Sequence, residues 1–395
     1  MGLLNRIFGS KNFQTFITKV TGINSSNITF NDWNGGMYDS DIAKSAIHTN
    51  ASNIGKLRPK HIRRTKDTVV HFPDKKIERM LQYPNPYMNM YDFLYKVGTH
   101  REEKDNAFIY FNRESYELYP INASSIELVE TKTNNLFARF RFRLGQTVVI
   151  PFEDLIIIRK HFNKHDLFGD NEDTLMSTMK VIDTADQGIV NAIKNAANLR
   201  GILKFKSTLR EEDVKKLTKN FVDNYLSINN DGGVAPTDPR YDFEQVKNES
   251  FVPNKPQLDA SKERVYSYFG VNEKIIQSKF TEEEWNAYYE NTIEPVAIQL
   301  SLEFTKKIFS DNSQGHGNEI IFEANRLQYA SNNTKVLVSR LLTDIGAASI
   351  DDILEIFNMA PIGGEEGQRR VQTLNMINAK EADKYQVGEG GDNND

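Results

Sequence analysis

Cysteine is absent from the 395-residue chain, and tryptophan occurs only twice. Without cysteine there can be no disulfide, zinc ribbon, thiol nucleophile or iron–sulfur cluster. No stretch approaches the run of about 18 apolar residues that crosses a membrane, and the first residues lack the apolar region of a signal peptide. We therefore expect a protein without membrane spans, cofactors or cysteine-bound metals.

A large excess of one charge is also missing, because 49 Lys and Arg face 54 Asp and Glu, a net charge of −5. This balance excludes a generally basic nucleic-acid coat. The charge is uneven, however: residues 1–66 hold ten Lys or Arg against three Asp, and from Asp344 onward eleven acidic residues face four basic ones. The basic run at 56–66 fits either a nucleic-acid patch or an edge strand with solvated charges. The acidic, Gly-rich C-terminal end predicts disorder.

At about 150 residues per domain, the length predicts two or three domains. The first 160 residues indicate an α+β domain with a helix over 40–56 and a short helix that begins at Met90. Apolar and β-branched runs predict strands at 57–64, 68–72, 107–111, 116–121, 125–130, 136–142, 147–150 and 154–159. The close spacing of the last six predicts one meandering sheet.

From residue 172 onward helices predominate. The predicted order is a helix over 172–200, a β-α-β unit (202–206, 208–226, 241–246), a helix over 257–269, a polar loop over 270–281, a helix over 282–309, a strand over 319–325 and helical residues over 332–359. Ser349 is the expected N-cap of a new helix after a break near residue 345.

Two of these helices, 172–200 and 282–309, carry apolar residues at three- and four-residue steps, a pattern that packs against another helix. At 1.5 Å per residue, the first would extend roughly 40 Å, more than one small core covers. We therefore expect this helix to bridge regions of the protein or to line an assembly in which neighbouring copies of the chain cover the stripes. Pro295 lies inside the second helix and predicts a kink, since it lacks a donor and clashes with the carbonyl of Asn291.

Catalytic patterns are weak. His161 and His165 would share one face if their segment were helical, as in a metal site of a nuclease. The segment has no HExxH pattern and no calcium-loop spacing, and a polar connector that leads to a helix N-terminus explains it equally simply. We expect no enzyme, cofactor or metal site, with a metal-dependent nuclease as a remote alternative.

Several short motifs, in their order and spacing, resemble those of the portal proteins of tailed bacteriophages, the head-to-tail connectors. They are Tyr83-Pro-Asn-Pro86, Asn106-Ala-Phe108, Leu118-Tyr-Pro-Ile121, Phe152-Glu-Asp-Leu155, Gly201-Ile-Leu-Lys204, Phe269-Gly-Val271 and Asn291-Thr-Ile-Glu-Pro-Val296. The resemblance covers residues 38–375. Members of the family often have a histidine in the strand after the Phe-Glu-Asp tripeptide, where this chain has Ile157 or a neighbouring residue.

The resemblance implies an α+β portal-type fold in a ring oligomer around a DNA channel, and the ring would be a dodecamer in the virion, as in the family. Its parts would be an α/β wing (1–172 and 282–331), a two-helix stem (173–200 and 254–269), a β-α-β clip (201–253), a tunnel loop (270–281) and a small helical crown (332–395) that ends in the acidic tail.

The implied function is a channel at one capsid vertex for DNA packaging and ejection. The implied partners are copies of itself, double-stranded DNA without sequence preference, the terminase large subunit, a head–tail adaptor, and the major capsid and scaffold proteins. The location would be the virion, after assembly in the host cytoplasm. Another ring-forming neck or baseplate component is the alternative.

The resemblance also suggests two sets of functional residues. In the tunnel loop, DNA would meet Lys274, Gln277, Ser278 and Lys279, with lysine–phosphate contacts that grip without reading bases. Twelve copies with a charge of −5 would carry about −60, which keeps the duplex from sticking. In the clip, Arg210, Lys215, Lys216 and Lys219 would dock the motor and later the neck. The alternatives are lysines that keep a loop soluble and a solvated helix face with i,i+4 ion pairs.

Overall fold

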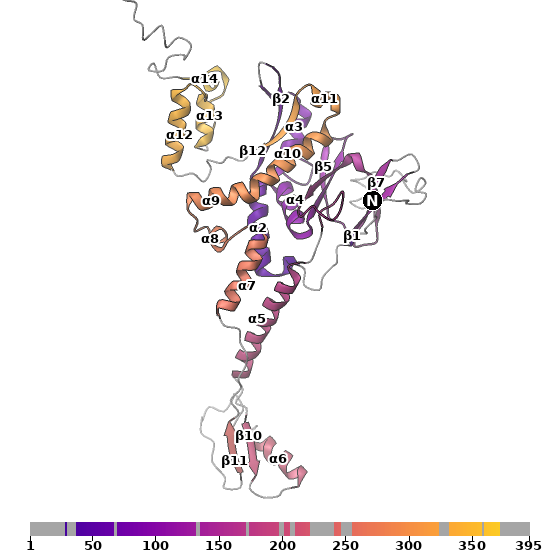
Figure 1. Ribbon diagram of the computed structural model, residues 1–395, viewed down its shortest axis with the longest axis vertical. Coiled ribbons are helices and arrows are strands. Elements are labelled where there is room, and N and C mark those ends of the chain that lie inside the picture. The colour runs from indigo at the N-terminus through magenta and orange to yellow at the C-terminus, as the bar shows by residue number, and fades with distance from the viewer. Residues whose placement is uncertain are drawn as a thin grey trace, which may run out of the picture. The chain divides into compact units, whose positions relative to one another are not determined.

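The computed structural model describes residues 28–29, 37–66, 69–131, 135–170, 174–196, 201–205, 210–221, 241–245, 255–323, 332–357 and 359–371. The chain divides into two compact units, Met1–Glu172 with Phe269–Asp395, and Asp173–Tyr268 (Figure 1). The predicted disordered tail lies outside the described residues, as do 222–240 of the clip and 324–331 of the wing.

A three-stranded antiparallel sheet of the first unit joins the start of the chain to its last quarter. Its order is β12 (Asn318–Glu323), β2 (Arg58–Arg64) and β3 (Val69–His71), so β2 is the central strand. The edge-strand interpretation of residues 56–66 is therefore wrong, because β12 arrives from more than 250 residues later. Three of the cations pair with carboxylates: Arg58 with Glu355 at 3.1 Å, Lys60 with Glu323 at 2.7 Å, and Arg64 with Glu319.

The six strands predicted between residues 107 and 159 are all present, but they form two sheets. One has the order β5 (Glu117–Ile121), β4 (Asn106–Asn112), β9 (Leu155–Arg159), and the other β1 (Ile28–Thr29), β6 (Ser125–Glu130), β7 (Leu136–Arg141), β8 (Thr147–Pro151). The predicted single meander is wrong because β4 pairs with β9 across the whole second hairpin. Local strand signals carry no information about such distant pairing.

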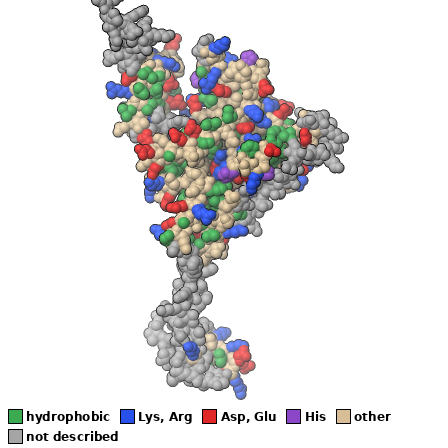
Figure 2. Space-filling view, viewed as in Figure 1, with side chains coloured by type: hydrophobic (Ala, Val, Ile, Leu, Met, Phe, Trp, Pro, Cys, Tyr) green, Lys and Arg blue, Asp and Glu red, His purple; other side chains and the backbone are tan. Residues whose placement is uncertain are grey.

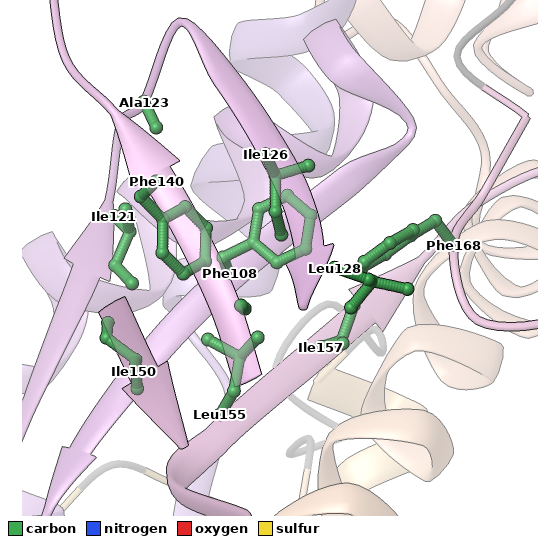
Figure 3. Packing of buried hydrophobic residues seen from close by; sticks show 11 residues of the cluster. Phe108, Ile121, Ala123, Ile126, Leu128, Phe140, Ile150, Leu155, Ile157 and Phe168 are labelled. Carbon is green, nitrogen blue, oxygen red and sulfur yellow. The ribbon is translucent and has the colours of Figure 1, made fainter. Parts of the chain in front are cut away.

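One apolar cluster joins these two sheets (Figure 3). Phe108 of β4 meets the edge of Phe140 of β7, with ring centroids 5.5 Å apart, and Phe168 lies against the other side of Phe108 at 5.6 Å. Alternate residues of each strand supply the cluster, since successive side chains point to opposite faces. The burial of these rings holds the two sheets against each other. Strand β9 of one sheet leads directly into residues 160–170.

Helix α2 (Asp41–Gly55) confirms the predicted helix, and α4 (Met90–Lys104) is longer than predicted. They pack closely at Gly98, where an added Cβ would lie 3.1 Å from Ile54 Cδ1. Helix α3 (Lys75–Gln82) was not predicted, although Asp74 caps it through hydrogen bonds from the amides of Lys76 and Ile77.

The helix predicted over 282–309 is a composite of α9 (Glu282–Tyr288), a π-helical segment (Tyr289–Ile293) and α10 (Glu294–Ile308). The π segment lies directly before Pro295, where an α-helix would bring the proline ring against the carbonyl of Asn291. The irregularity expected at this proline thus takes the form of a changed hydrogen-bond pattern.

The described parts of both predicted apolar stripes pack within the chain itself. Trp285, Ile293, Leu300 and Phe304 are buried within the first unit. In the second unit, α5 (Met176–Ala196) buries Met179 and Ile182 and contacts α7 (Lys255–Tyr268). The prediction that these stripes pack against other elements is confirmed over these residues, and cover by neighbouring copies stays a prediction.

The second unit also contains a hairpin and a charged helix. Strands β10 (Gly201–Phe205) and β11 (Tyr241–Gln245) pair antiparallel over five residues each, and α6 (Glu211–Phe221) comes between them in the chain. The predicted strand–helix–strand order is confirmed over the described residues, and residues 222–226 of the predicted helix lie outside them.

The C-terminal described residues are helical, as predicted. They form α12 (Asn332–Asp344), α13 (Ile350–Ile356) and the short α14 (Gly364–Gln368), and β12 is preceded by the unpredicted α11 (Asp311–Gly315). Ser349 caps α13 in a capping box with Asp352, which confirms the N-cap prediction. Across the described ranges, no helix combines the length and apolar character needed to cross a bilayer.

Candidate functional sites

The segment predicted as a polar loop over 270–281 contains a helical turn, α8 (Glu273–Ile276). Asn272 caps it, because its Oδ1 accepts a hydrogen bond of 2.9 Å from the amide of Ile275. The side chain of Ile275 is buried. The loop prediction is wrong in this respect: one apolar residue in a polar segment gives no periodicity, but it is enough to hold a turn against the core.

Helix α8 ends in a Schellman motif that fixes the backbone of Ser278 and Lys279. Ser278 has a φ of 57°, in the left-handed region. Its amide donates to the carbonyl of Ile275 at 3.2 Å, and the amide of Lys279 donates to the carbonyl of Lys274 at 2.8 Å. These two bonds satisfy the last carbonyls of the turn, so Lys279 leaves the helix from a defined position.

The four proposed DNA-facing side chains have different surroundings. Lys274 Nζ binds the carboxylate of Glu284 in α9, and Gln277 Nε2 donates to Glu273 Oε1 at 2.6 Å. Lys279 is exposed and forms no ion pair with a described residue. The hydrogen bond from Lys274, followed by that from the Thr281 amide, lowers the pKa of Glu284. Lys274 thus fastens α8 to α9, and Lys279 is the cation that remains open to solvent.

Hydrogen bonds between neutral groups hold the chain where it returns to the first unit. Asn50 of α2 is fully buried; its Nδ2 donates to the carbonyl of Phe269 at 2.8 Å, and its Oδ1 accepts from the Tyr288 hydroxyl at 2.9 Å. Thr292 Oγ1 donates to the carbonyl of Gly270 at 3.0 Å. We call this set, Asn50, Tyr288 and Thr292, the amide anchor. It positions the residues that lead into α8.

Charged groups hold the chain where it leaves the first unit. Glu102 of α4 is 2 % exposed and binds Lys160 Nζ at 2.7 Å and Arg101 Nη1 at 2.6 Å. Burial alone would raise the pKa of Glu102, but the two cations outweigh that effect, so its pKa lies below the ordinary value. We call Glu102, Arg101 and Lys160 the ionic anchor. Lys160 Nζ also lies 4.9 Å from the ring centroid of Phe269, beside the return connection.

Backbone contacts complete this outgoing connection. The amide of Gly169 donates to Asn106 Oδ1 at 2.8 Å, and the amide of Lys160 donates to the carbonyl of Asp105 at 2.8 Å. A Cβ on Gly169 would lie 2.2 Å from the Lys160 carbonyl oxygen and 2.4 Å from that of Asp105. Only glycine fits there. No sequence pattern points to this glycine, because the two carbonyl oxygens that crowd it come from other segments of the chain.

The geometry assumed for a metal site at His161 and His165 is absent. Their segment is not helical, and His161 Nδ1 lies 3.0 Å from Asp105 Oδ1. Within the described ranges, no group of three or more metal-binding side chains comes together. The polar-connector interpretation therefore agrees better with the structure.

The Phe152-Glu-Asp154 tripeptide forms a short 3-10 turn that fastens the end of α10. Arg113 donates to Asp154 Oδ1 at 2.5 Å and to the carbonyl of Lys307 at 3.0 Å. Lys307 Nζ returns a hydrogen bond of 2.7 Å to the carbonyl of Phe152, and burial lowers its pKa. The tripeptide thus stabilises the position of the C-terminal end of α10 through Arg113 and Lys307.

Three of the four proposed docking cations lie on α6, and Arg210 directly precedes it. Lys215 pairs with Glu211 at 2.7 Å, with both side chains largely exposed. Arg210, Lys216 and Lys219 are exposed and have no ion pair with any residue that the structure describes. Figure 2 shows acidic and basic side chains next to each other over α6. Arg210, Lys216 and Lys219, which lie outside the Lys215–Glu211 pair, are therefore the cations available to an external partner.

A family model described as phage portal protein matches residues 42–358. The chain belongs to the phage portal protein family. It is 26% identical over 187 residues to the probable portal proteins of Lactococcus phage p2 and Lactococcus phage SK1, which covers 45% of this chain and 47% of each relative. The chain thus spans about half the length of the curated relatives it matches.

Solved structures show the same portal fold. The neck of an empty GTA particle computed with C6 symmetry gives a TM-score of 0.61 at 13% identity, over 83% of this chain and 92% of that one. The virion of a native gene transfer agent particle gives 0.57 at 14% identity, over the same shares. The portal family match runs from α2 to α13, so it contains both anchors, α8 and α6.

Proposed function

We propose that this portal-family chain forms a closed ring at one capsid vertex and that double-stranded DNA passes through the ring during packaging and ejection. The family match over residues 42–358 is the observation that carries the proposal. In support, a similar chain comes from the neck of a native GTA particle computed with C12 symmetry. A ring of twelve copies is accordingly our expectation for this chain. It would act as a structural conduit without enzymatic activity.

The parts of the chain are assigned as the resemblance implies. The first unit would supply the wing and the crown, with α12 to α14 in the crown. The second unit would supply the stem, from α5 and α7, and the clip, from β10, α6 and β11. Division of the chain at Asp173 and Tyr268 supports this assignment, because stem and clip are contiguous in sequence between two parts of the wing.

Imaging of the purified protein down its long axis tests the ring directly. Annular particles with an open centre are expected. A compact monomer at high concentration, without annular particles in any condition, would overturn the proposal. Cryo-imaging of phage particles would then test the location at the capsid vertex, where the major capsid and scaffold proteins are the proposed neighbours during assembly in the host cytoplasm.

In the proposed channel, Lys279 would be the main contact to DNA phosphates. Its neighbour Lys274 is bound to Glu284, whereas Lys279 is open to solvent and fixed at its backbone. Lysine–phosphate contacts are electrostatic and independent of sequence, so they permit sliding. Gln277 and Ser278 would shape this segment rather than hold DNA, since one binds Glu273 and the other occupies the left-handed position.

The variant Lys279→Ala tests this assignment, with Lys274→Ala as the matched control. Lys279→Ala should form normal rings but package or retain less DNA, with the largest deficit at low salt, where a lysine–phosphate contact is strongest. Lys274→Ala should instead loosen the α8 segment, which hydrogen exchange of residues 272–280 would detect. Normal packaging and retention in Lys279→Ala rings would contradict the role of this lysine.

The exposed cations of α6 would dock the terminase large subunit and later the head–tail adaptor. Lys216 and Lys219 are available for such a contact, together with Arg210, whereas Lys215 is engaged with Glu211. The double reversal Lys216→Glu/Lys219→Glu should weaken motor binding to purified rings at least tenfold, and Lys215→Ala should change it little. Unchanged motor binding in the double variant would remove this role.

A further inference from the structure

The helices of the first unit have apolar residues on a second face, which the core does not use. On α10, Ile298 is 54 % exposed and Leu302 is 66 % exposed. They follow each other at a four-residue step, whereas Leu300 and Phe304 of the same helix point into the core. We call Ile298 and Leu302 the α10 face. A pair of large apolar side chains left in water at helical spacing is typical of an interaction surface.

Helix α12 has a comparable face. Its exposed apolar residues recur at four-residue steps from Leu337, with Val336 beside them and Ser339 buried on the opposite side of the helix. They are Val336, Leu337 and Leu341, continued by Ile345 just after the helix, with exposed fractions of 55 %, 68 %, 60 % and 48 %. We call these residues the α12 face. Hydrophobic side chains gather over α12 and α13 at the upper left of Figure 2.

Two different exposed faces are what a closed ring of more than two copies needs. A two-fold dimer places the same surface of each copy in contact, whereas a ring brings one surface of a copy against a different surface of the next. Every copy therefore carries both halves of the interface. A chain with one apolar face alone could not propagate around a ring.

We propose that the α10 face of each copy is covered by the α12 face of the next copy in the ring. This inference rests on the proposed function, since it names the subunit contact that would close the ring. The occupant is a second copy of this chain, with Leu337 and Leu341 packed against Ile298 and Leu302. The buried stripes of α5 and α9–α10 play no part in this contact.

The charges beside the two faces are complementary. Arg340 lies within the α12 face, with its side chain 80 % exposed and only a 3.9 Å contact to Asp344. The α10 face is preceded by carboxylates, of which Glu290 is exposed. If the α12 face packs against the α10 face, Arg340 would lie near the acidic residues that precede α10. Opposite charges at the rim favour this pairing over two α12 faces, which would oppose arginines.

The absence of cysteine from the chain permits a direct test. Two cysteines are introduced as Leu302→Cys and Leu341→Cys in one chain, and assembled rings are treated with a short bifunctional maleimide. The double variant should yield a ladder of covalently linked copies up to the full ring on a denaturing gel. Each single variant should remain at the size of one chain, because identical positions do not meet in a head-to-tail contact. Leu302→Cys with Leu144→Cys is the matched control, since Leu144 is 89 % exposed in a turn outside both faces, and it should give no ladder.

Every other result contradicts the inference. Absence of a ladder from rings confirmed by imaging means that another surface closes the ring. Crosslinking of a single variant means that a face meets its own copy. A linked species of one-chain size means that α12 covers α10 of its own chain. Absence of rings from the unaltered protein would instead defeat the proposed function.

Charge substitutions give a second readout. Leu302→Glu and Leu341→Glu should each abolish rings while leaving a folded subunit, because both side chains are exposed in the single chain. Mixed in equal amounts, the two variants retain one intact face each and should form pairs but no rings. Rings at normal yield from either variant alone would overturn the contact.

Discussion

The chain passes between its two units twice, and the two connections are fastened by different chemistry. The outgoing connection at 160–170 is held by the ionic anchor, with Glu102 between Lys160 and Arg101. The return connection at 269–270 is held by the amide anchor, centred on Asn50. Both anchors are buried in the first unit, yet only one depends on charge. Proton concentration should therefore act on the outgoing connection first, and the loss of a neutral side chain should act on the return connection alone.

Removal of the central carboxylate should have the largest effect. Glu102→Gln leaves Lys160 and Arg101 without their buried partner and should lower the free energy of unfolding by about 3–5 kcal/mol, the usual cost of breaking a buried ion pair from one side. Urea unfolding at one protein concentration measures this loss. The exposed Glu263→Gln on α7 is the control and should stay within about 0.5 kcal/mol. Equal midpoints for the two variants would show that the ionic anchor contributes little.

The amide anchor should come next. Asn50→Ala removes the buried hydrogen bonds that join α2 to the carbonyl of Phe269 and the hydroxyl of Tyr288 and opens a small cavity, so the free energy of unfolding should fall by about 2–4 kcal/mol. Hydrogen exchange should rise at residues 269–276 and stay unchanged at 160–170. The exposed Asn286→Ala is the control. Faster exchange at both connections would mean that the two anchors act as one.

A fall in pH should lower the stability of the folded protein near the ionic anchor, through a histidine two positions before Glu102 in α4. His100 on α4 is buried, and burial, then Lys104 and Lys96, lower its pKa from 6.5 to about 3. The folded state therefore holds this histidine neutral while the unfolded state binds a proton below pH 6.5, so stability is lost as the pH falls through that window. At about 1.4 kcal/mol per pH unit, the loss should reach about 3 kcal/mol near pH 4.5. The lowered pKa of Glu102 adds its own loss only at more acidic pH.

The variant His100→Leu checks this assignment. Its stability should stay nearly constant between pH 6.5 and about pH 4.5, whereas the unaltered protein should weaken, as urea midpoints across that range would show. Parallel decline of the two proteins would place the acid sensitivity elsewhere.

The smallest expected effect is a gain. Ser278 occupies a left-handed position at the end of α8, which glycine adopts without strain. Ser278→Gly should raise the free energy of unfolding by about 0.5–1 kcal/mol, and Ser278→Ala should not. Hydrogen exchange at Lys279 would detect the firmer turn. A loss of stability in the glycine variant would indicate that the serine side chain holds the turn.

The sequence predicted elements well where periodicity is local. Helix α2, the strands between residues 106 and 159 and the N-cap at Ser349 all follow from side-chain spacing or a single capping residue. Contacts between distant segments, such as strand pairing, could not be predicted in the same way. Asn50 meets Phe269 across 219 positions of sequence, and β2 becomes central only because β12 arrives from the last quarter of the chain. Neither contact leaves a pattern in either segment alone.

The candidate site shows the same limit. The resemblance located the segment 270–281 and its lysines, but it could not show that Lys274 is tied to Glu284 while Lys279 stays open. That difference arises from the capping box of α9, which aims the Glu284 carboxylate back toward α8. The role of Gly169 was missed altogether, because its importance lies in two carbonyl oxygens that crowd it.

The π-helical turn at Tyr289–Ile293 has a consequence for how portal sequences of this kind can diverge in length. A π turn holds one residue more than the α turn it replaces, so loss of one residue there would return the helix to ordinary α geometry and leave the residues after it on the same faces. Loss of one residue within α10 has no such reserve and would rotate everything after it by about 100°. Natural losses of a single residue should therefore be tolerated at Tyr289–Ile293 and avoided within α10.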